Sequence, residues 1–294
     1  MFQKAIRQNT KIKVAVTGAS GSGKTYSALR LATGLAENGR IAVIDTENQS
    51  SSLYSEFFDF DICPISPPYT HDKFISAIKE AEVQGYNVVI IDSFSHCWEG
   101  TLSFKESLDA RGGSTFGNWA EAGKRYKAVL NSKLQSNIHV IAAMRSKTEY
   151  LVEKDDKGRS VPKKLGLAPI ARDGSEFEFA VVFNLDSAHQ AMADKDRTNL
   201  FVDKIFQITE DTGRTISEWL KGGVDPSLSL QEELETIGTE LYGEAWDSKR
   251  KELVRHISGG QLEEASHLSG NQIQRLIDGM RKKMRPEPEM DGVR

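Results

Sequence analysis

The sequence predicts an α/β fold with a mostly parallel central sheet and a small helical domain at the C-terminal end. Up to about residue 222, short apolar runs rich in β-formers alternate with amphipathic stretches, which is typical of βαβ units. Beyond that point the chain is charged, and its apolar residues recur at helical spacing. A length of 294 residues fits about two domains.

The elements follow in order along the first domain. Strands are expected at residues 11–17, 40–46, 87–92, 137–144 and 178–185, with helices between them at 24–37, 72–84 and 118–135. The last of these helices is supported by Ala122, Tyr126 and Val129, which share one helical face. Shorter β segments at 190–193 and 200–207 and a helix at 216–220 complete the domain.

A glycine pair and a proline between residues 221 and 226 predict a linker, because glycine ends a helix and proline starts the next one. Helices are expected beyond it at 229–242, 246–256 and 271–283. The domain boundaries are therefore placed at 1–222 and 223–283. The remainder, 284–294, carries two prolines and many charges and is expected to be a disordered tail.

Composition excludes several classes of protein. With 38% hydrophobic and 27% charged residues, the chain is expected to be a globular protein with a real core and no membrane contact. Two cysteines cannot make a disulfide framework, and the N-terminus lacks the apolar stretch of a signal peptide. A cytoplasmic location is therefore expected. The net charge of −4 confines any nucleic-acid binding to a local basic patch.

A glycine-rich motif predicts a nucleoside triphosphate site. The segment Gly18-Ala19-Ser20-Gly21-Ser22-Gly23-Lys24-Thr25 fits G-x-x-x-x-G-K-[ST] at every fixed position, and it lies between an expected strand and an expected helix. Glycines let successive backbone N–H groups point at a phosphate, and the helix N-terminus adds partial positive charge. Lys24 is expected to reach the β- and γ-phosphates, and the Thr25 hydroxyl to ligate Mg²⁺.

Two carboxylates follow other expected strands. The run Val88-Val89-Ile90-Ile91-Asp92 describes a buried parallel strand that presents an acid at its C-terminal edge, where ligands of α/β proteins bind. Asp92 is expected to hold Mg²⁺ through water. Glu47, just past the second strand, is placed to orient the water that attacks the γ-phosphate.

At this point the sequence resembles the RecA-like recombinase core, which carries its catalytic glutamate in an Ile-Asp-x-Glu segment that Glu47 matches. That family places an adenine-stacking tyrosine seven residues later, and Tyr54 falls at this spacing. More closely, residues 11–222 resemble the phage RecA-like ATPases that act in single-strand annealing or recombination. The segments that carry this likeness are 140–145, 149–150, 172–179 and 195–198.

The resemblance implies further roles. Lys195 and Arg197 are spaced like the pair of cationic residues that contacts the γ-phosphate of a neighbouring subunit in this family. The alternative interpretation is that they are two solvated surface charges in a turn. The recombinase core usually has a γ-phosphate-sensing glutamine at the end of its fourth strand. This chain has Arg145 there, which is the candidate to take the sensor's place near the γ-phosphate, although a guanidinium is not an amide and the chain departs from the family at this position.

Two loops of RecA-like proteins bind DNA, and they correspond roughly to residues 95–117 and 146–175 here. The second is expected to form a β-hairpin around Asp155-Asp156-Lys157-Gly158. One arm concentrates the cations Lys157, Arg159, Lys163 and Lys164, which could follow a phosphate backbone. An ordinary solvated hairpin is the alternative.

Together these features predict an ATPase that binds ATP and Mg²⁺, assembles into a ring or filament of identical chains, and grips single-stranded DNA during phage-type recombination or annealing. A single-strand-binding protein is a further expected partner, and a bacterial cell that hosts a phage or prophage is the expected setting. Two other functions stay open: an ATP-dependent switch that binds a protein partner without touching DNA, and a P-loop kinase acting on a small molecule.

Overall fold

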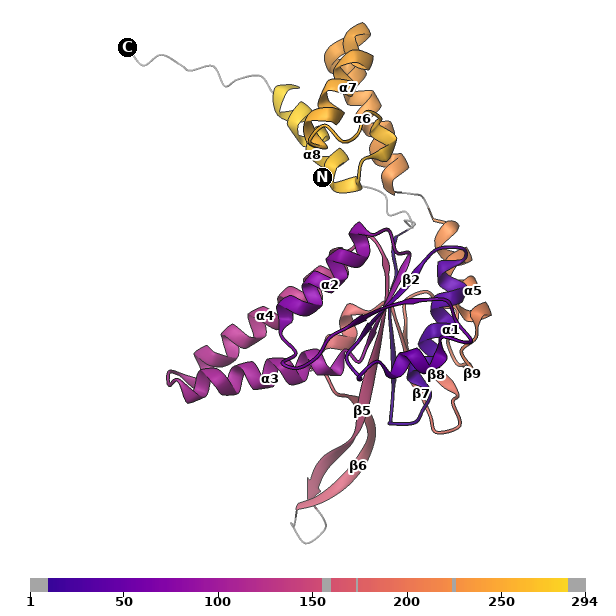
Figure 1. Ribbon diagram of the computed structural model, residues 1–294, viewed down its shortest axis with the longest axis vertical. Coiled ribbons are helices and arrows are strands. Elements are labelled where there is room, and N and C mark those ends of the chain that lie inside the picture. The colour runs from indigo at the N-terminus through magenta and orange to yellow at the C-terminus, as the bar shows by residue number, and fades with distance from the viewer. Residues whose placement is uncertain (1–9, 155–159, 173, 224–225, 285–294) are drawn as a thin grey trace. The chain divides into compact units, whose positions relative to one another are not determined.

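The computed structural model describes residues 10–154, 160–172, 174–223 and 226–284. The chain divides into two compact units, one formed by Lys11–Trp219 and another that begins at Leu220 (Figure 1). Each unit is described by itself. No helix in the described segments is both long and apolar enough to cross a bilayer.

The first unit is built on one sheet with the strand order β3-β2-β4-β5-β1-β7-β8-β9. Its parallel strands are β1 (Lys13–Gly18), β2 (Ile41–Asp45), β3 (Asp61–Pro64), β4 (Val88–Asp92), β5 (His139–Lys154) and β7 (Val181–Leu185). Two antiparallel strands, β8 (Ala191–Asp196) and β9 (Ile205–Phe206), extend it at one edge. The α/β class with a mostly parallel sheet is confirmed.

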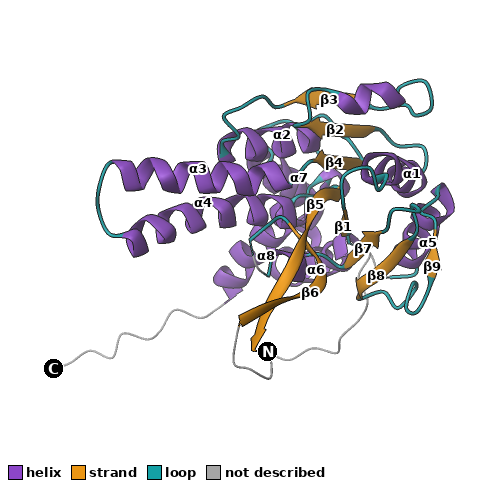
Figure 2. Cartoon of the chain, turned by 90° about the horizontal axis from the view of Figure 1, so that it is seen from below, coloured by secondary structure: helices purple, strands orange, loops and turns teal. Residues whose placement is uncertain are grey.

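Helices cover both faces of this sheet (Figure 2). They are α1 (Lys24–Ala36), α2 (His71–Val83), α3 (Ser95–Ala110), α4 (Thr115–Gln135) and α5 (Glu210–Lys221). Phe74 of α2 and Tyr126 of α4 pack with Ile44 and Ile91 in one buried cluster, so α2 and α4 lie on the same face. On the other face α1 meets α5 so closely that a Cβ built at Gly34 would collide with the backbone of α5.

Strand β5 is about twice as long as the expected strand at 137–144. Its first half pairs with β1 and β4 inside the sheet, up to the pair Gly18 and Arg145. Its second half leaves the sheet and pairs with β6 (Ser160–Pro169) as an antiparallel hairpin (Figure 1). The expected β-hairpin is therefore present, and its tip, 155–159, lies outside the described residues.

The expectation of a DNA-binding loop at 95–117 is wrong, because helices occupy most of this range. Residues 95–110 form α3, and α4 begins at Thr115 rather than at 118, so only a short turn separates two helices that extend side by side (Figures 1 and 2). The segment before Gly112 contains no proline, and its apolar residues Cys97 and Trp98 pack against the core cluster. Helix propensity and this contact favour a helix over a flexible loop.

The second unit is helical. It contains α6 (Pro226–Tyr242), α7 (Trp246–Ile257) and α8 (Gly270–Met284), with short 3₁₀ turns at Gly243–Ala245 and Ala265–His267. Leu234, Trp246 and Ile277 belong to a core of its own. The Trp246 ring fills the space over Gly238, where a built Cβ would collide with the indole. Linker residues 224–225 and the expected disordered tail from 285 lie outside the described residues.

Candidate active site

The glycine-rich motif forms a tight loop between β1 and α1 at the C-terminal edge of the sheet. Gly21 and Gly23 have φ values of 79° and 83°, which side chains rarely adopt. A Cβ built at Gly18 would lie 2.9 Å from the Leu185 carbonyl oxygen and would also collide with Ser22 Oγ, so a larger residue would force the backbone to shift. The first N–H groups of α1 have no partner within the helix and are available to an anion.

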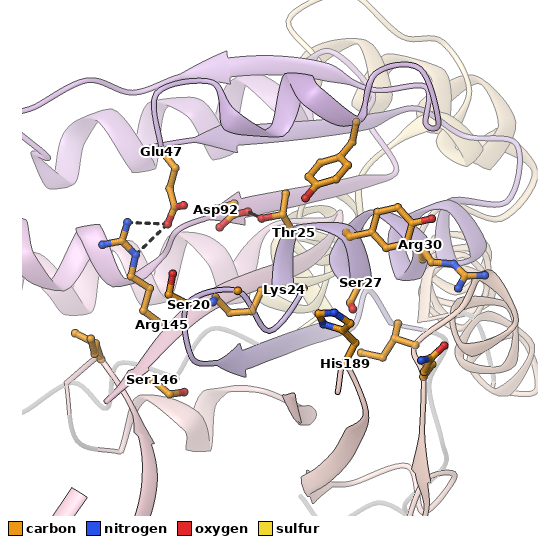
Figure 3. A pocket seen from close by; sticks show the side chains of 17 residues that line it. Ser20, Lys24, Thr25, Ser27, Arg30, Glu47, Asp92, Arg145, Ser146 and His189 are labelled. Carbon is orange, nitrogen blue, oxygen red and sulfur yellow. Dashed lines mark hydrogen bonds and ion pairs between the residues drawn. The ribbon is translucent and has the colours of Figure 1, made fainter. Parts of the chain in front are cut away.

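Two side chains at the start of α1 face the other half of the site. Lys24 Nζ donates to the Ala19 carbonyl oxygen across the loop (2.8 Å), which holds the ammonium in the loop's concavity. Thr25 Oγ1 donates to Asp92 Oδ2 (2.6 Å), so β4 delivers its carboxylate to the phosphate loop as the sequence predicts. Figure 3 shows these residues together.

Asp92 is almost completely excluded from solvent. Its side chain is buried, and burial raises the pKa of this carboxyl to about 6, helped by the nearby charges of Glu47 and Asp45 and opposed by the Thr25 hydrogen bond and Lys24. Burial also lowers the pKa of Lys24, against the raising effects of Asp92 and Glu47. A cation bound beside Asp92 would relieve this crowding of negative charge.

The donor set fits Mg²⁺. A hydroxyl and a carboxylate oxygen that already approach to 2.6 Å are the hard ligands this ion uses beside phosphates and water. Within the described segments, no three His, Cys, Asp or Glu side chains form a metal cluster of their own. Thr25 and Asp92 therefore suit a metal ion whose other ligands are phosphate oxygens and water. They do not suit a structural metal ion that is held by protein side chains alone.

The loop after β2 carries Glu47 and is held by Asp45. Asp45 Oδ1 accepts the backbone N–H groups of Glu47 (2.7 Å) and Gln49 (3.0 Å). Its Oδ2 accepts the backbone N–H (3.1 Å) and the hydroxyl (2.5 Å) of Ser51. One buried carboxylate thus fixes both Glu47 and the 3₁₀ turn Ser50–Tyr54 that presents Tyr54.

Glu47 is paired with Arg145. Arg145 Nε and Nη2 lie 3.0 and 2.9 Å from Glu47 Oε1, and both side chains line the pocket (Figure 3). The sequence predicts Arg145 near the γ-phosphate, and the structure places it beside the candidate base. Arg145 is also the last residue of β5 that pairs with β1, so the base touches the point where the hairpin leaves the sheet.

Thr46, His96 and Tyr69 form a packed layer behind the loop that carries Glu47. Thr46 Oγ1 lies 2.6 Å from His96 Nδ1 and accepts the N–H of Ser93 at 2.7 Å. The Tyr69 ring stacks on the His96 ring with centroids 4.5 Å apart. Burial, followed by the Arg145 charge, lowers the pKa of His96, so the imidazole is neutral near pH 7. His96 is therefore a packing residue behind Glu47.

The pocket around these groups has a volume of about 780 Å³. Beyond the motif, Glu47, Asp92 and Arg145, its lining includes Tyr26, Arg30, Tyr54, His189, Gln207 and Ile208. The Tyr54 ring lies against the Tyr26 ring, with centroids 5.6 Å apart and an angle of 61°. Tyr54 thus lines the pocket, and its expected stacking on adenine stays a prediction.

Several of the lining residues are not predicted from the sequence. Tyr26 follows Thr25 directly and could have been found from the motif alone. Arg30 lies one helical turn further and is held by Glu210 at 2.6 and 2.9 Å. His189 lies in the turn after β7 and Gln207 in the segment after β9, and the sheet order brings both to the phosphate loop.

The structure does not bring Lys195 and Arg197 to the same pocket. They lie at the far end of β8, where Lys195 is paired in register with Val182 at the start of β7. Lys195 Nζ and Arg197 Nη2 both donate to the Phe177 carbonyl oxygen, at 2.7 and 3.3 Å. They therefore cannot serve the nucleotide site of their own chain, and a role in a neighbouring chain stays a prediction.

The four hairpin cations are only partly described. Lys163 and Lys164 lie on β6, paired with Leu151 and Tyr150 of β5. Lys157 and Arg159 lie outside the described residues. Their proposed contact with DNA stays a prediction.

This loop, lysine, threonine and strand-end aspartate define the site of a P-loop ATPase. The chain belongs to a family within this class, because residues 10–185 match the family model described as "AAA domain". No curated protein sequence matches the chain. Among solved structures, a prototypical ATPase from the type III secretion system of pathogenic bacteria superposes with a TM-score of 0.43 and 12% identity, over 95% of this chain and 87% of that one.

Proposed function

We propose that this protein hydrolyses Mg-ATP and uses the cycle to control its grip on single-stranded DNA, in phage-type homologous recombination or annealing. The observation that carries the proposal is the path of β5. One continuous strand starts in the sheet between β4 and β1, reaches the phosphate loop at Arg145, which pairs with Gly18 and contacts Glu47, and then continues into the hairpin that carries the basic arm.

The proposed chemistry uses residues already in place. The loop N–H groups and Lys24 hold the phosphates, and Thr25 with Asp92 would hold Mg²⁺. The ion would supply positive charge that offsets the negative charge of the phosphates during hydrolysis. Glu47 accepts a proton from the attacking water, which it orients toward the γ-phosphate. Excluding bulk water around Asp92 strengthens each of these charge interactions.

Arg145 connects the candidate base Glu47 to the β5–β6 hairpin. Its N–H donates to Ser95 Oγ (3.0 Å), and its carbonyl oxygen accepts from Ile170 N, the residue that follows β6 (2.6 Å). Both arms of the hairpin therefore meet at the residue that pairs with Glu47. A γ-phosphate would compete with Glu47 for the guanidinium, and strain on the hairpin would move the same group.

Binding to DNA would rest on the hairpin and on assembly. Residues 146–175 contain seven cations and five anions, with Lys157, Arg159, Lys163 and Lys164 on one arm. Backbone contacts by such an arm are independent of sequence and weaken steeply with salt. In a ring or filament of identical chains, Lys195 and Arg197 would be offered to a neighbour's γ-phosphate, and a single-strand-binding protein would be a partner on the DNA.

An ATP-dependent switch that binds a protein is the second candidate. The observation in its favour is the pair α3 and α4, which extends beyond the sheet and exposes Phe116 (83% of its surface) and Trp119 (40%) near the turn. Exposed aromatic side chains are typical of protein interfaces.

ATP hydrolysis with and without single-stranded DNA separates the two candidates. Wild type is expected to hydrolyse faster with DNA, and changing Lys157, Arg159, Lys163 and Lys164 together to Ser should remove the stimulation while the basal rate stays. A matched control changes four cations elsewhere, Lys79, Lys124, Lys127 and Lys251, to Ser. Hydrolysis indifferent to DNA in the wild type would reject the DNA-coupled proposal and favour the protein switch.

A further inference from the structure

The pocket has two chemically different ends, and the strand order explains them. Asp92, Arg145 and Glu47 come from β4, β5 and the loop after β2, all on one side of β1. On the other side of β1 lies β7, followed by the turn that carries His189. Figure 3 shows Glu47 and Arg145 at one end and His189 with Ser27 and Arg30 at the other.

This polarity fixes the direction of a bound nucleotide. Lys24, Thr25 and Asp92 mark where the β- and γ-phosphates lie, and Glu47 marks the water side of the γ-phosphate. The chain of phosphates therefore runs back along the start of α1, and the nucleoside must leave on the side away from Glu47. The lining residues that remain for that end, beside the phosphate loop and Ser27, are Tyr26, Arg30, Tyr54, His189, Gln207 and Ile208.

His189 is presented by a well-ordered turn between β7 and β8. Asp186 Oδ1 accepts the N–H groups of Ala188 and Gln190, each at 2.8 Å. Asp186 N donates to the Gln190 carbonyl oxygen (3.0 Å), and His189 N donates to the Asp186 carbonyl oxygen (3.2 Å). His189 itself has a φ of 62°, a conformation that non-glycine residues seldom adopt. The turn therefore fixes the backbone from which the imidazole projects toward the phosphate loop.

The imidazole lies directly on the phosphate loop. A Cβ built at Gly23 would be only 3.0 Å from His189 Nδ1, so the ring occupies the space that the last glycine of the motif leaves open. Neither ring nitrogen has a hydrogen-bond or ion-pair partner within the described part of the chain. An exposed imidazole with two free nitrogens therefore faces the nucleoside end of the pocket.

The opposite wall suits a planar ligand. Tyr26 is 40% exposed, and its ring is buttressed edge-to-face by Tyr54 and Phe58, with centroids 5.6 and 5.3 Å away. Arg30 is engaged by Glu210 through two hydrogen bonds and is thus not free to contact a phosphate. Ile208, at 2% exposure, closes the space beside His189 with an apolar surface.

We propose that His189 contacts the nucleoside part, the ribose or base, of a nucleoside triphosphate bound in this pocket, and so discriminates nucleotides from other polyphosphates. The inference rests on the proposed nucleotide site and adds a residue to it. Its imidazole supplies a donor and an acceptor at the nucleoside end, opposite the Tyr26 ring.

Equilibrium binding to ATP and to inorganic tripolyphosphate, both with Mg²⁺, tests the assignment. His189→Gly removes the ring and suits the positive φ, and His189→Asn keeps a short polar group that tolerates this conformation. We expect His189→Gly to weaken ATP binding about tenfold, the equivalent of about 1.4 kcal/mol, with tripolyphosphate binding unchanged. Gln190→Ala on the same turn is the control and should change neither.

Three results would overturn the assignment. An equal loss for ATP and tripolyphosphate in His189→Gly would mean that the residue serves the phosphates or the loop's structure. ATP binding within twofold of wild type would mean that it touches no part of the nucleotide. Failure of the wild type to bind ATP would instead reject the proposed nucleotide site itself, and His189 with it.

Discussion

Asp45 shows how one buried carboxylate sets the position of the candidate base. Four donors from Glu47, Gln49 and Ser51 converge on its two oxygens. An amide in its place would turn an NH₂ group toward donors that need an acceptor, and each unsatisfied buried group costs about 1–3 kcal/mol. The position of Glu47 therefore depends on a residue that does not itself face the nucleotide.

Asp45→Asn is expected to lower the free energy of unfolding by about 1–3 kcal/mol and to lower kcat at least tenfold, because small displacements of a base are costly. KM for ATP should change little, since Lys24 and Thr25 are untouched. Urea unfolding and steady-state hydrolysis measure the two effects. The exposed Asp59→Asn is the control, and an unchanged kcat in Asp45→Asn would contradict this role.

At the residue scale, the sequence predicts the parts of the site whose spacing is local. The loop from Gly18 to Thr25 is contiguous, and Asp92 follows an unmistakable buried strand, so the sequence alone predicts the place of both. It does not predict the Arg145–Glu47 pair or the place of His189, because these contacts join segments 98 residues apart or depend on which strand flanks β1. These residues meet only because the strand order of the sheet places their segments side by side.

Helix α4 carries an unusual buried charge at its C-terminal end. Lys133 is fully buried, its Nζ has no hydrogen-bond partner in the described structure, and it lies 3.4 Å from the centroid of the Phe179 ring. A cation–π contact is worth about 2 kcal/mol when desolvated, which is less than the cost of burying an ammonium. Burial accordingly lowers the pKa of Lys133 to about 7, against the attraction of Glu178.

This pKa gives stability a definite pH dependence. Between pH 7 and the ordinary lysine pKa of 10.5, the unfolded chain binds more protons than the folded one, so stability rises with pH. Below pH 7 Lys133 is protonated in both the folded and the unfolded state, so the full cost of burying its ammonium lowers the free energy of unfolding. Lys13, whose pKa burial also lowers to about 7, adds a slope of the same sign.

Lys133→Met is therefore expected to raise the free energy of unfolding at pH 7 by about 1–3 kcal/mol, and to flatten its rise between pH 7 and 9.5 to the part that Lys13 supplies. Urea unfolding at the two pH values measures both. Lys127→Met, an exposed position on the same helix, should leave stability and slope as they are. A less stable Lys133→Met with an unchanged slope would contradict this account.

At the element scale, sequence patterns predict the buried parallel strands and fail at elements that tertiary contact creates. The strand at Val88–Asp92 and the helix at Lys24–Ala36 have strong local patterns and are found. Helix α3 has no clean apolar stripe in its sequence and depends on packing against α4 and the core. The edge strand Asp61–Pro64 is four residues long and ends at proline, too little for a periodic signal.

For the whole molecule, the two units have separate cores, and among the described residues those that line the nucleotide pocket all belong to the first unit. A chain ending after Gly222 is therefore expected to fold and to bind ATP with a Kd within about threefold of the full chain, because the first unit keeps both its own core and the described lining of the pocket. Calorimetry and equilibrium binding measure this. A truncated chain that folds but loses ATP binding would mean that the helical unit contributes to the site.

The central claim is that the carboxylate of Glu47 activates water at a Mg-ATP site built by the loop 18–25 and Asp92. The most direct measurement is single-turnover ATP hydrolysis by Glu47→Gln, beside ATP binding by the same variant. We predict binding within twofold of wild type and a rate lower by about 10²–10⁴, the usual contribution of a general base. The exposed Glu56→Gln should hydrolyse as wild type does. A Glu47→Gln variant that binds ATP and hydrolyses it at the wild-type rate would contradict the claim.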